Sequence, residues 1–305
     1  MRRIKEYFKK QSEKMQDIEY VKRLYRRTSN EMLVLILAFA LFFYFNYNYV
    51  LFKLKMATEF VYTNALDDLS NEHLGKDFSV RDMDALTIAL YGDALKDEDK
   101  FFRLYRQGEF KNELDEMEDM GGDTRVYTSK AGAGVISFTL FSPQALKNVK
   151  DRLSLLKGCD TVIIDLRGNT GGMVGTAEGF ASLFLEKGDT IYSYASKSGY
   201  KTVKNRKTPQ LTPQKIIILQ DEMTASASEI FIMALRENLD NVEIIGTVSY
   251  GKGVGQNEYF LTGGYGFKFT SMKLFTPSGA SINGSGIVPD TVCEDGSIQA
   301  EMLKE

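Results

Sequence analysis

The sequence predicts an α/β domain over residues 126–305, preceded by a single membrane-spanning helix and a short helical region. From about Val126 onward, short runs rich in β-branched and aromatic residues alternate with amphipathic stretches, which is the pattern of a sheet covered by helices. Residues 32–52 form a 21-residue segment without a charged side chain. As a helix this segment would be about 30 Å long, which matches the hydrocarbon core of a bilayer.

The charge distribution gives this helix a direction. Residues 1–30 carry ten Lys and Arg against four Asp and Glu, a balance of +6, so the rest of the chain sums to −9. The positive-inside rule makes residues 1–30 a cytoplasmic basic tail and residues 31–53 the transmembrane helix. A buried helix of a soluble domain would have to tolerate this charge beside it, and a cleavable signal peptide would lack a clear cleavage site. We therefore expect a single-pass cell-membrane protein with an extracytoplasmic domain, in contact with the lipid bilayer through residues 32–52.

Residues 54–125 are expected to form an extracytoplasmic helical region. Apolar residues recur at spacings of three and four along Ala57–Leu69 and Met83–Leu95. Five carboxylates fall within Glu113–Asp119. A metal site is one interpretation of that cluster, but the interleaved Leu114 and Met117 favour a solvated helix face.

The elements of the core follow from the change of hydrophobic period along the chain. Apolar runs predict strands at Gly134–Leu140, Thr161–Leu166, Lys215–Gln220, Val242–Val248, Glu258–Leu261 and Phe267–Phe275. Amphipathic stretches predict helices at Pro143–Lys157, at Val174–Leu185 and from Glu229 to about Leu239. Such alternation predicts a largely covered sheet.

Composition excludes several function classes. A net charge of −3 gives no reason to expect a nucleic-acid partner. With one histidine, His73, and two cysteines, the chain cannot assemble the usual four-ligand structural zinc sites or a three-histidine site. A Ser-His-Asp enzyme would have to use His73, so a nucleophilic hydrolase of this composition is expected to use another base. Cys159 and Cys293 fit a disulfide or two buried thiols equally well.

Three segments carry candidate chemistry, and the first is Val162–Gly172, an apolar strand that runs into a glycine turn and then a helix. Such a turn presents backbone N–H groups at a helix N-terminus, where negative charge is stabilised. A Rossmann fingerprint fails because Thr170 stands where its second glycine is required, and a P-loop fails at Met173 and Val174. An anion hole for a tetrahedral intermediate remains consistent with the turn.

The second segment, Lys215–Ile230, is another apolar strand followed by a polar turn and a helix. A serine at this junction exposes its hydroxyl to the field of the helix N-terminus. An N-cap is the commoner role for serine before a helix, and Ser228 suits that role better than Ser226.

The third segment, Ser249–Gln256, joins two strands and places Lys252 between two glycines. Gly251 and Gly253 allow close approach of other backbone, and the resulting burial would lower the pKa of the lysine. The same lysine, taken alone, is also typical of a surface turn.

The three segments and a fourth stretch, Thr276–Asp290, occur in an order that closely resembles the C-terminal processing peptidases, also called tail-specific proteases, of peptidase family S41. The resemblance covers about residues 126–295 and rests on DLRGNTGG, TASASEI, GKGVGQ and TPSGASINGSGIVPD. It implies a ClpP/crotonase-like core and a serine-type peptidase with a Ser/Lys dyad, one of the convergent alternatives to the triad.

The resemblance also implies the roles of individual residues. Ser226 matches the nucleophile, Lys252 the general base, and Gln256 the glutamine that orients the lysine. The backbone amides of Gly171, Gly172 and Ala227 would form the oxyanion hole. The implied reaction is hydrolysis of a polypeptide substrate through an acyl-enzyme, with no metal or organic cofactor and no nucleic-acid partner, at a bacterial cell membrane.

The sequence departs from the family pattern in three places. Ala280 stands where the family often has arginine, and Asp221 stands near a position of asparagine. Many relatives carry a PDZ domain before the core, whereas residues 54–125 predict helices, so a preference for C-terminal tails is an open question. A catalytically inactive, membrane-tethered binding protein is the alternative function. A homo-oligomer or an activating partner is compatible with either.

Overall fold

The computed structural model describes residues 32–41, 98–105, 123–260 and 266–293, together with isolated residues between 47 and 109 and Leu303. The expected helices Ala57–Leu69 and Met83–Leu95 lie almost entirely outside the described residues. The basic tail and the acidic stretch Glu113–Asp119 lie wholly outside them.

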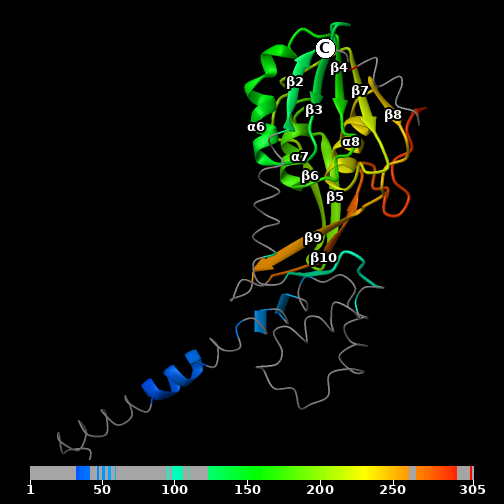
Figure 1. Ribbon diagram of the computed structural model, residues 1–305. Coiled ribbons are helices and arrows are strands. Elements are labelled where there is room, and N and C mark those ends of the chain that lie inside the picture. Colours follow the sequence, from blue (N-terminus) through cyan, green and yellow to red (C-terminus); the bar gives the residue numbers. More distant parts are fainter. Residues whose placement is uncertain are drawn as a thin grey trace, which may run out of the picture.

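A six-stranded sheet forms the centre of the domain, with the strand order β11-β8-β7-β4-β3-β2 (Figure 1). All neighbouring strands are parallel except β2, which pairs antiparallel with β3 at one edge. The strands are β2 (Arg125–Thr128), β3 (Gly134–Ser137), β4 (Thr161–Asp165), β7 (Lys215–Gln220), β8 (Val242–Gly246) and β11 (Thr291–Val292). The central strands are near-continuous apolar runs because a parallel sheet is buried on both faces.

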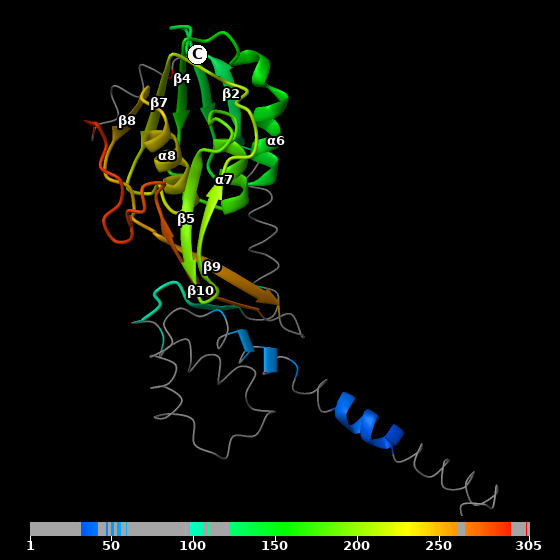
Figure 2. The same cartoon turned by 180° about the vertical axis from the view of Figure 1, so that it is seen from behind.

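Three helices cover one face of this sheet: α6 (Pro143–Asp151), α7 (Val174–Ala181) and α8 (Ala227–Asn238) (Figure 2). Their buried side chains pack with Ile164 and Ile218 in the larger core cluster, in which the Phe138 and Phe180 rings stack at 4.5 Å between centroids. The opposite face buries a smaller cluster that includes Ile163 and Cys293. The predicted covered α/β sheet is therefore confirmed.

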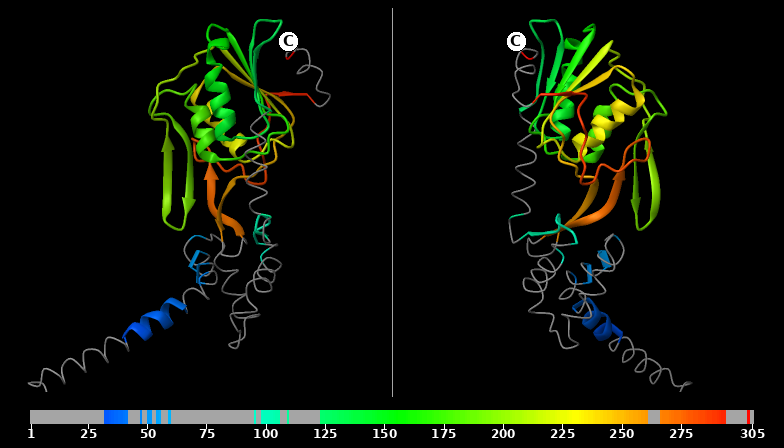
Figure 3. Two further views of the ribbon diagram at one scale, coloured as in Figure 1. Left: turned by 60° about the vertical axis from the view of Figure 1, so that its left-hand side comes forward. Right: turned by 90° about the vertical axis from the view of Figure 1, so that its right-hand side faces the viewer.

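A second, five-stranded sheet extends below the first and is antiparallel throughout (Figure 3). Its strands are β1 (Arg103–Tyr105), β5 (Thr190–Ser196), β6 (Gly199–Lys204), β9 (Val254–Phe260) and β10 (Gly266–Phe275). β10 is the hub of this sheet, since it pairs with β9, with β1 at its beginning and with β5 at its end. The β5–β6 hairpin was not among the predicted elements, because its outer strand is exposed and polar.

Several predicted boundaries are corrected by the structure. The helix expected over Pro143–Lys157 ends at Asp151 and is followed by a short 3-10 turn, Leu153–Leu155. The strand expected from Glu258 begins at Val254. Both cysteines are free thiols, with Cys293 buried and Cys159 half-buried.

The described N-terminal residues form a helix over 32–41, and its apolar side chains are exposed, from Met32 to Leu41. Within the ranges that the structure describes, no helix combines the length and the apolar character needed to cross a bilayer. Further along, Glu59 accepts hydrogen bonds from Asn257 and Tyr259 and so contacts the core at β9.

Candidate active site

The three segments singled out from the sequence meet at one edge of the central sheet. The glycine turn follows β4, the serine turn follows β7, and the lysine turn follows β8. β4, β7 and β8 are parallel and adjacent, so their carboxyl ends lie together. In open α/β sheets this edge is where ligands bind.

Ser226 occupies a strained turn between β7 and α8. Its φ of 58° and ψ of −115° make it the one non-glycine residue with positive φ among the described residues. Such a conformation costs on the order of 1–3 kcal/mol and persists only where the surroundings hold it in place. The turn leaves Ser226 half-buried at the N-terminus of α8.

The structure corrects the expected N-cap of α8. Ser226, not Ser228, is the N-cap residue of α8. Ser228 lies inside the first turn of the helix, fully buried, and its hydroxyl donates to the side-chain and backbone oxygens of Asn169 at 2.9 and 3.0 Å. The Ser228 hydroxyl faces inward and ties the serine turn to the glycine turn.

The glycine turn presses directly against the serine turn. Gly171 has a φ of +110°, and a Cβ there would lie 2.9 Å from Ser226 Cβ and 2.8 Å from the Ala225 carbonyl oxygen, so no side chain fits. The Gly171 amide donates to Asn169 Oδ1 at 3.0 Å. In the described structure the amides of Gly172 and Ala227 have no acceptor, which leaves them as the unoccupied donors beside Ser226.

Lys252 is partly buried, as its flanking glycines suggested. The loop around Asn283 packs so closely that a Cβ on Gly253 would lie 2.7 Å from the Asn283 amide nitrogen. A Cβ on Gly251 would lie 2.7 Å from the Gly286 amide nitrogen. Burial lowers the pKa of Lys252, and the like charge of Lys268 lowers the pKa further. The carboxylates of Glu258, Asp99 and Glu229 act in the opposite direction without reversing the shift.

Gln256 holds the lysine ammonium through its side-chain amide. Lys252 Nζ donates to Gln256 Oε1 at 2.9 Å, and Gln256 Nε2 donates to the Phe101 carbonyl oxygen at 2.8 Å. The Phe101 ring covers the same ammonium at 4.6 Å. Asp99, which is buried, fastens this upstream segment to β10 by accepting from the amide and hydroxyl of Thr270, both at 2.7 Å.

Ser226, Lys252, Gln256 and Gly172 line one groove of about 670 Å³. Within the described residues, no hydrogen bond joins the Ser226 hydroxyl to the Lys252 ammonium. Hydrogen bonds between catalytic groups are often long in unliganded sites and shorten when substrate binds. The groove therefore brings the Ser226 hydroxyl, a lysine with a lowered pKa and the backbone of Gly172 to a single cavity.

The buried carboxylate of Glu229 joins the serine turn to the lysine turn. Its Oε2 accepts from the amides of Ser226 and Lys252 at 2.8 and 2.9 Å. Its Oε1 accepts from the Ser249 hydroxyl at 2.6 Å and the Gly251 amide at 2.7 Å. Four donors thus satisfy one carboxylate that has no exposed surface.

Asp221, near the position where the family pattern has asparagine, bridges the glycine and serine turns. Its Oδ1 accepts from the amides of Gly168, Met223 and Thr224, each at 3.0 Å. The Asp221 carboxylate therefore accepts hydrogen bonds from the backbone of both turns and joins them.

A serine at a strand–helix turn beside a partly buried lysine is typical of serine-type hydrolases that use lysine in the place of histidine. The comparison with known proteins gives the family. The model of peptidase family S41 matches residues 132–293, more than half of the chain. The chain belongs to peptidase family S41 and is a homologue of its C-terminal processing proteases.

Two curated relatives illustrate the match. The chain is 37% identical over 170 residues to the chloroplastic carboxyl-terminal-processing peptidase 1 of Arabidopsis thaliana, covering 54% of this chain and 34% of that protein. It is 35% identical over 163 residues to the carboxy-terminal processing protease CtpA of Bacillus subtilis, covering 53% and 35%. The chain thus spans about a third of the length of these relatives.

A solved structure extends the fold comparison beyond the core. A lipoprotein from Streptococcus agalactiae superposes with a TM-score of 0.64, at 18% sequence identity, over 84% of this chain and 94% of that one. This likeness concerns the fold alone.

Sequence reasoning missed the groups that support the proposed dyad. Glu229 was named only as the start of a helix, although a carboxylate three residues after an N-cap serine is the capping-box signal. Asp99 and Phe101 lie outside the family match, and no local pattern in the sequence connects them with Lys252.

Replacing Glu229 with glutamine should lower both stability and activity. The amide would place its own donors against some of the four donors that now surround a carboxylate, at a cost of about 2–4 kcal/mol in the free energy of unfolding. We expect the loosened turns to reduce kcat by roughly tenfold to a hundredfold. Chemical denaturation and single-turnover peptide cleavage measure the two effects.

Glu237→Gln is the matched control, because it lies on the same helix, is exposed and also accepts two hydrogen bonds, both from Ser278. It should shift stability by less than about 1 kcal/mol and leave kcat unchanged. Equal effects of the two substitutions would show that Glu229 does not organise the site.

The pH dependence of cleavage should report the charges around Lys252. A lysine acts as a base only when neutral, so kcat/KM should rise with pH through the lowered pKa of Lys252. Lys268→Gln removes a like charge, raises that pKa and moves the rise to higher pH. Glu258→Gln removes an opposite charge, lowers that pKa and moves the rise to lower pH. Lys268→Arg keeps the charge and should leave the profile in place, and shifts of the same sign in both glutamine variants would contradict this account.

Proposed function

We propose that the chain hydrolyses peptide bonds of extracytoplasmic proteins with Ser226 as nucleophile and Lys252 as general base. The observation that carries the proposal is the shared groove, in which a serine held at positive φ faces a desolvated lysine oriented by Gln256. Membership of the S41 family supports peptide hydrolysis as the reaction, and polypeptides as the substrates.

The chemistry follows from the groups present. Neutral Lys252 takes the proton from the Ser226 hydroxyl while the oxygen attacks the scissile carbonyl carbon. The amides of Gly172 and Ala227 stabilise the oxyanion, and the field of the α8 N-terminus adds to their effect. The ammonium returns its proton to the leaving amine. Lys252 then activates a water molecule, which releases the acyl group and regenerates the free serine.

The setting of this activity follows from the N-terminal sequence. A 21-residue uncharged segment at 32–52, preceded by a tail of charge +6, supports a single membrane-spanning helix with the peptidase core outside the cytoplasm. The contact of Glu59 with β9 supports placing the second sheet on the side of the core that faces the bilayer. Cleavage near C-termini is the substrate preference that the related processing proteases suggest.

Substitution of the dyad tests the mechanism. Ser226→Ala and Lys252→Ala should each lower the cleavage of an unstructured protein by the full-length chain by about a thousandfold or more, because the two groups act as a unit. Circular dichroism should show an unchanged fold. Ser198→Ala and Lys187→Ala, at exposed positions, are the controls. Undiminished cleavage by the dyad variants would reject the assignment, and mass spectrometry of the products would reveal any preference for tails.

Accessibility to a membrane-impermeant thiol reagent tests the topology. In a Cys159→Ser, Cys293→Ser background, Ser198→Cys in the core should react in intact bacterial cells. Ser12→Cys in the basic tail should react only after lysis, because the bilayer separates the two positions. Labelling of the tail cysteine in intact cells, or protection of the core cysteine, would overturn the proposed orientation.

A further inference from the structure

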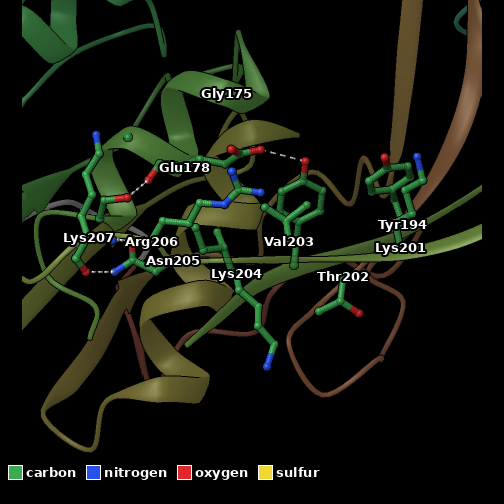
Figure 4. Close-up of a pocket in the computed structure, with 14 residues that line it drawn as sticks. Gly175, Glu178, Tyr194, Lys201, Thr202, Val203, Lys204, Asn205, Arg206 and Lys207 are labelled. Carbon is green, nitrogen blue, oxygen red and sulfur yellow. Dashed lines mark hydrogen bonds between the residues drawn. The ribbon is translucent and has the colours of Figure 1, made fainter. Parts of the chain in front are cut away.

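A second cavity adjoins the groove that contains Ser226 and Lys252. It has a volume of about 720 Å³ and lies between α7 and the β5–β6 hairpin (Figure 4). Gly175, Glu178, Tyr192 and Tyr194 line both spaces, so the two form a continuous depression. A polypeptide lying across the proposed dyad would therefore extend into this second cavity.

The cavity wall is strongly basic. Lys201, Arg206 and Lys207 contribute to its lining. Lys204 also contributes to the lining, and its side chain points away from that of Arg206 (Figure 4). In the part of the chain that the structure describes, no carboxylate forms an ion pair with Lys201, Arg206 or Lys207.

The single carboxylate of the cavity does not neutralise this wall. Glu178 accepts a hydrogen bond from the Tyr192 hydroxyl at 3.0 Å. Burial raises the pKa of Tyr192, so the hydroxyl stays protonated and remains a donor. Glu178 also lines the first groove, in the part of the lining that the two cavities share. An anionic substrate group is consequently repelled at Glu178 and attracted beyond it.

The basic wall is built on a rigid support. Asn205 is buried, and its side-chain amide donates to the carbonyl oxygens of Leu185, Glu186 and Lys207 at 2.6, 3.0 and 2.9 Å. Its Oδ1 accepts from the Lys207 amide at 3.1 Å. These bonds fix the backbone that carries Arg206 and Lys207. On the other side, Lys201 is in register with Tyr194 across the hairpin.

We propose that this cavity is a specificity subsite for acidic side chains of the polypeptide substrate, so that the enzyme cleaves within a few residues of Asp or Glu. The proposal rests on the proposed peptidase function and deepens it. Arginine and lysine bind carboxylates by charge-assisted hydrogen bonds, and the planar guanidinium of Arg206 can bind both oxygens at once. The chain as a whole carries a net charge of −3, so the positive charge of this cavity wall is opposite in sign to the net charge of the chain.

Cleavage specificity is the first test. The full-length chain is incubated with a peptide library of even composition, and mass spectrometry locates the cleaved bonds. Asp and Glu should be enriched at one or two positions on one side of the bond. A Lys201→Gln, Arg206→Gln, Lys207→Gln variant should lose roughly tenfold in the ratio of acidic to amide-containing peptides cleaved, since each exposed charge pair contributes modestly. Lys187→Gln, an exposed change outside the cavity, should retain the preference.

Binding to an inactive protein separates this proposal from the proposed function. Ser226→Ala full-length chain is titrated with a fluorescent acidic peptide and with its Gln/Asn counterpart, and anisotropy gives the two Kd values. Tighter binding of the acidic peptide, lost in the triple variant and weakened by salt, supports the subsite even if the parent enzyme cuts nothing. Equal Kd values for the two peptides, or cleavage by the parent without acidic enrichment, would overturn the subsite while leaving the peptidase function intact.

Discussion

The site depends on one buried carboxylate. Glu229 lies in the first turn of α8, and its two oxygens receive donors from the serine turn and from the lysine turn. A charge without exposed surface is stable only when every lone pair has a donor, so both turns must take their positions for the core to close around it. The geometry of the proposed nucleophile and base is therefore a condition of folding as well as of chemistry.

Different groups around Lys252 set its pKa and its orientation. Burial and the charge of Lys268 favour its neutral form, while Gln256 fixes where the nitrogen points. Phe101 contributes a ring over the nitrogen and a carbonyl oxygen for the glutamine. A single lysine thus has the two attributes that a histidine triad distributes between an imidazole and a carboxylate: a proton affinity suited to the task and a fixed orientation.

The sequence predicted the parts of this protein that local pattern determines. Apolar runs such as Lys215–Gln220 gave strands with correct bounds, and the order of four motifs gave the family. The β5–β6 hairpin escaped because β6 is exposed and has no apolar period. Ser226 was passed over as the N-cap although Glu229, three residues later, completes a capping box with it. Its positive φ and its close contact with Gly171 are not encoded by local spacing. Phe101 reaches Gln256 across 155 residues of chain, a contact that no local spacing encodes.

The attachment of β1 has a consequence for the order in which the molecule assembles. β1 precedes the family-matching core, yet its partner among the described strands is β10, near the end of that core. A ribosome therefore completes the strained serine turn and the lysine turn before the partner strand of β1 exists. Contacts between such distant parts of a chain form late, because closing a long loop is slow. The nascent chain consequently carries a Lys252 without the Phe101 ring over its ammonium until β10 has been synthesised and β1 can pair with it.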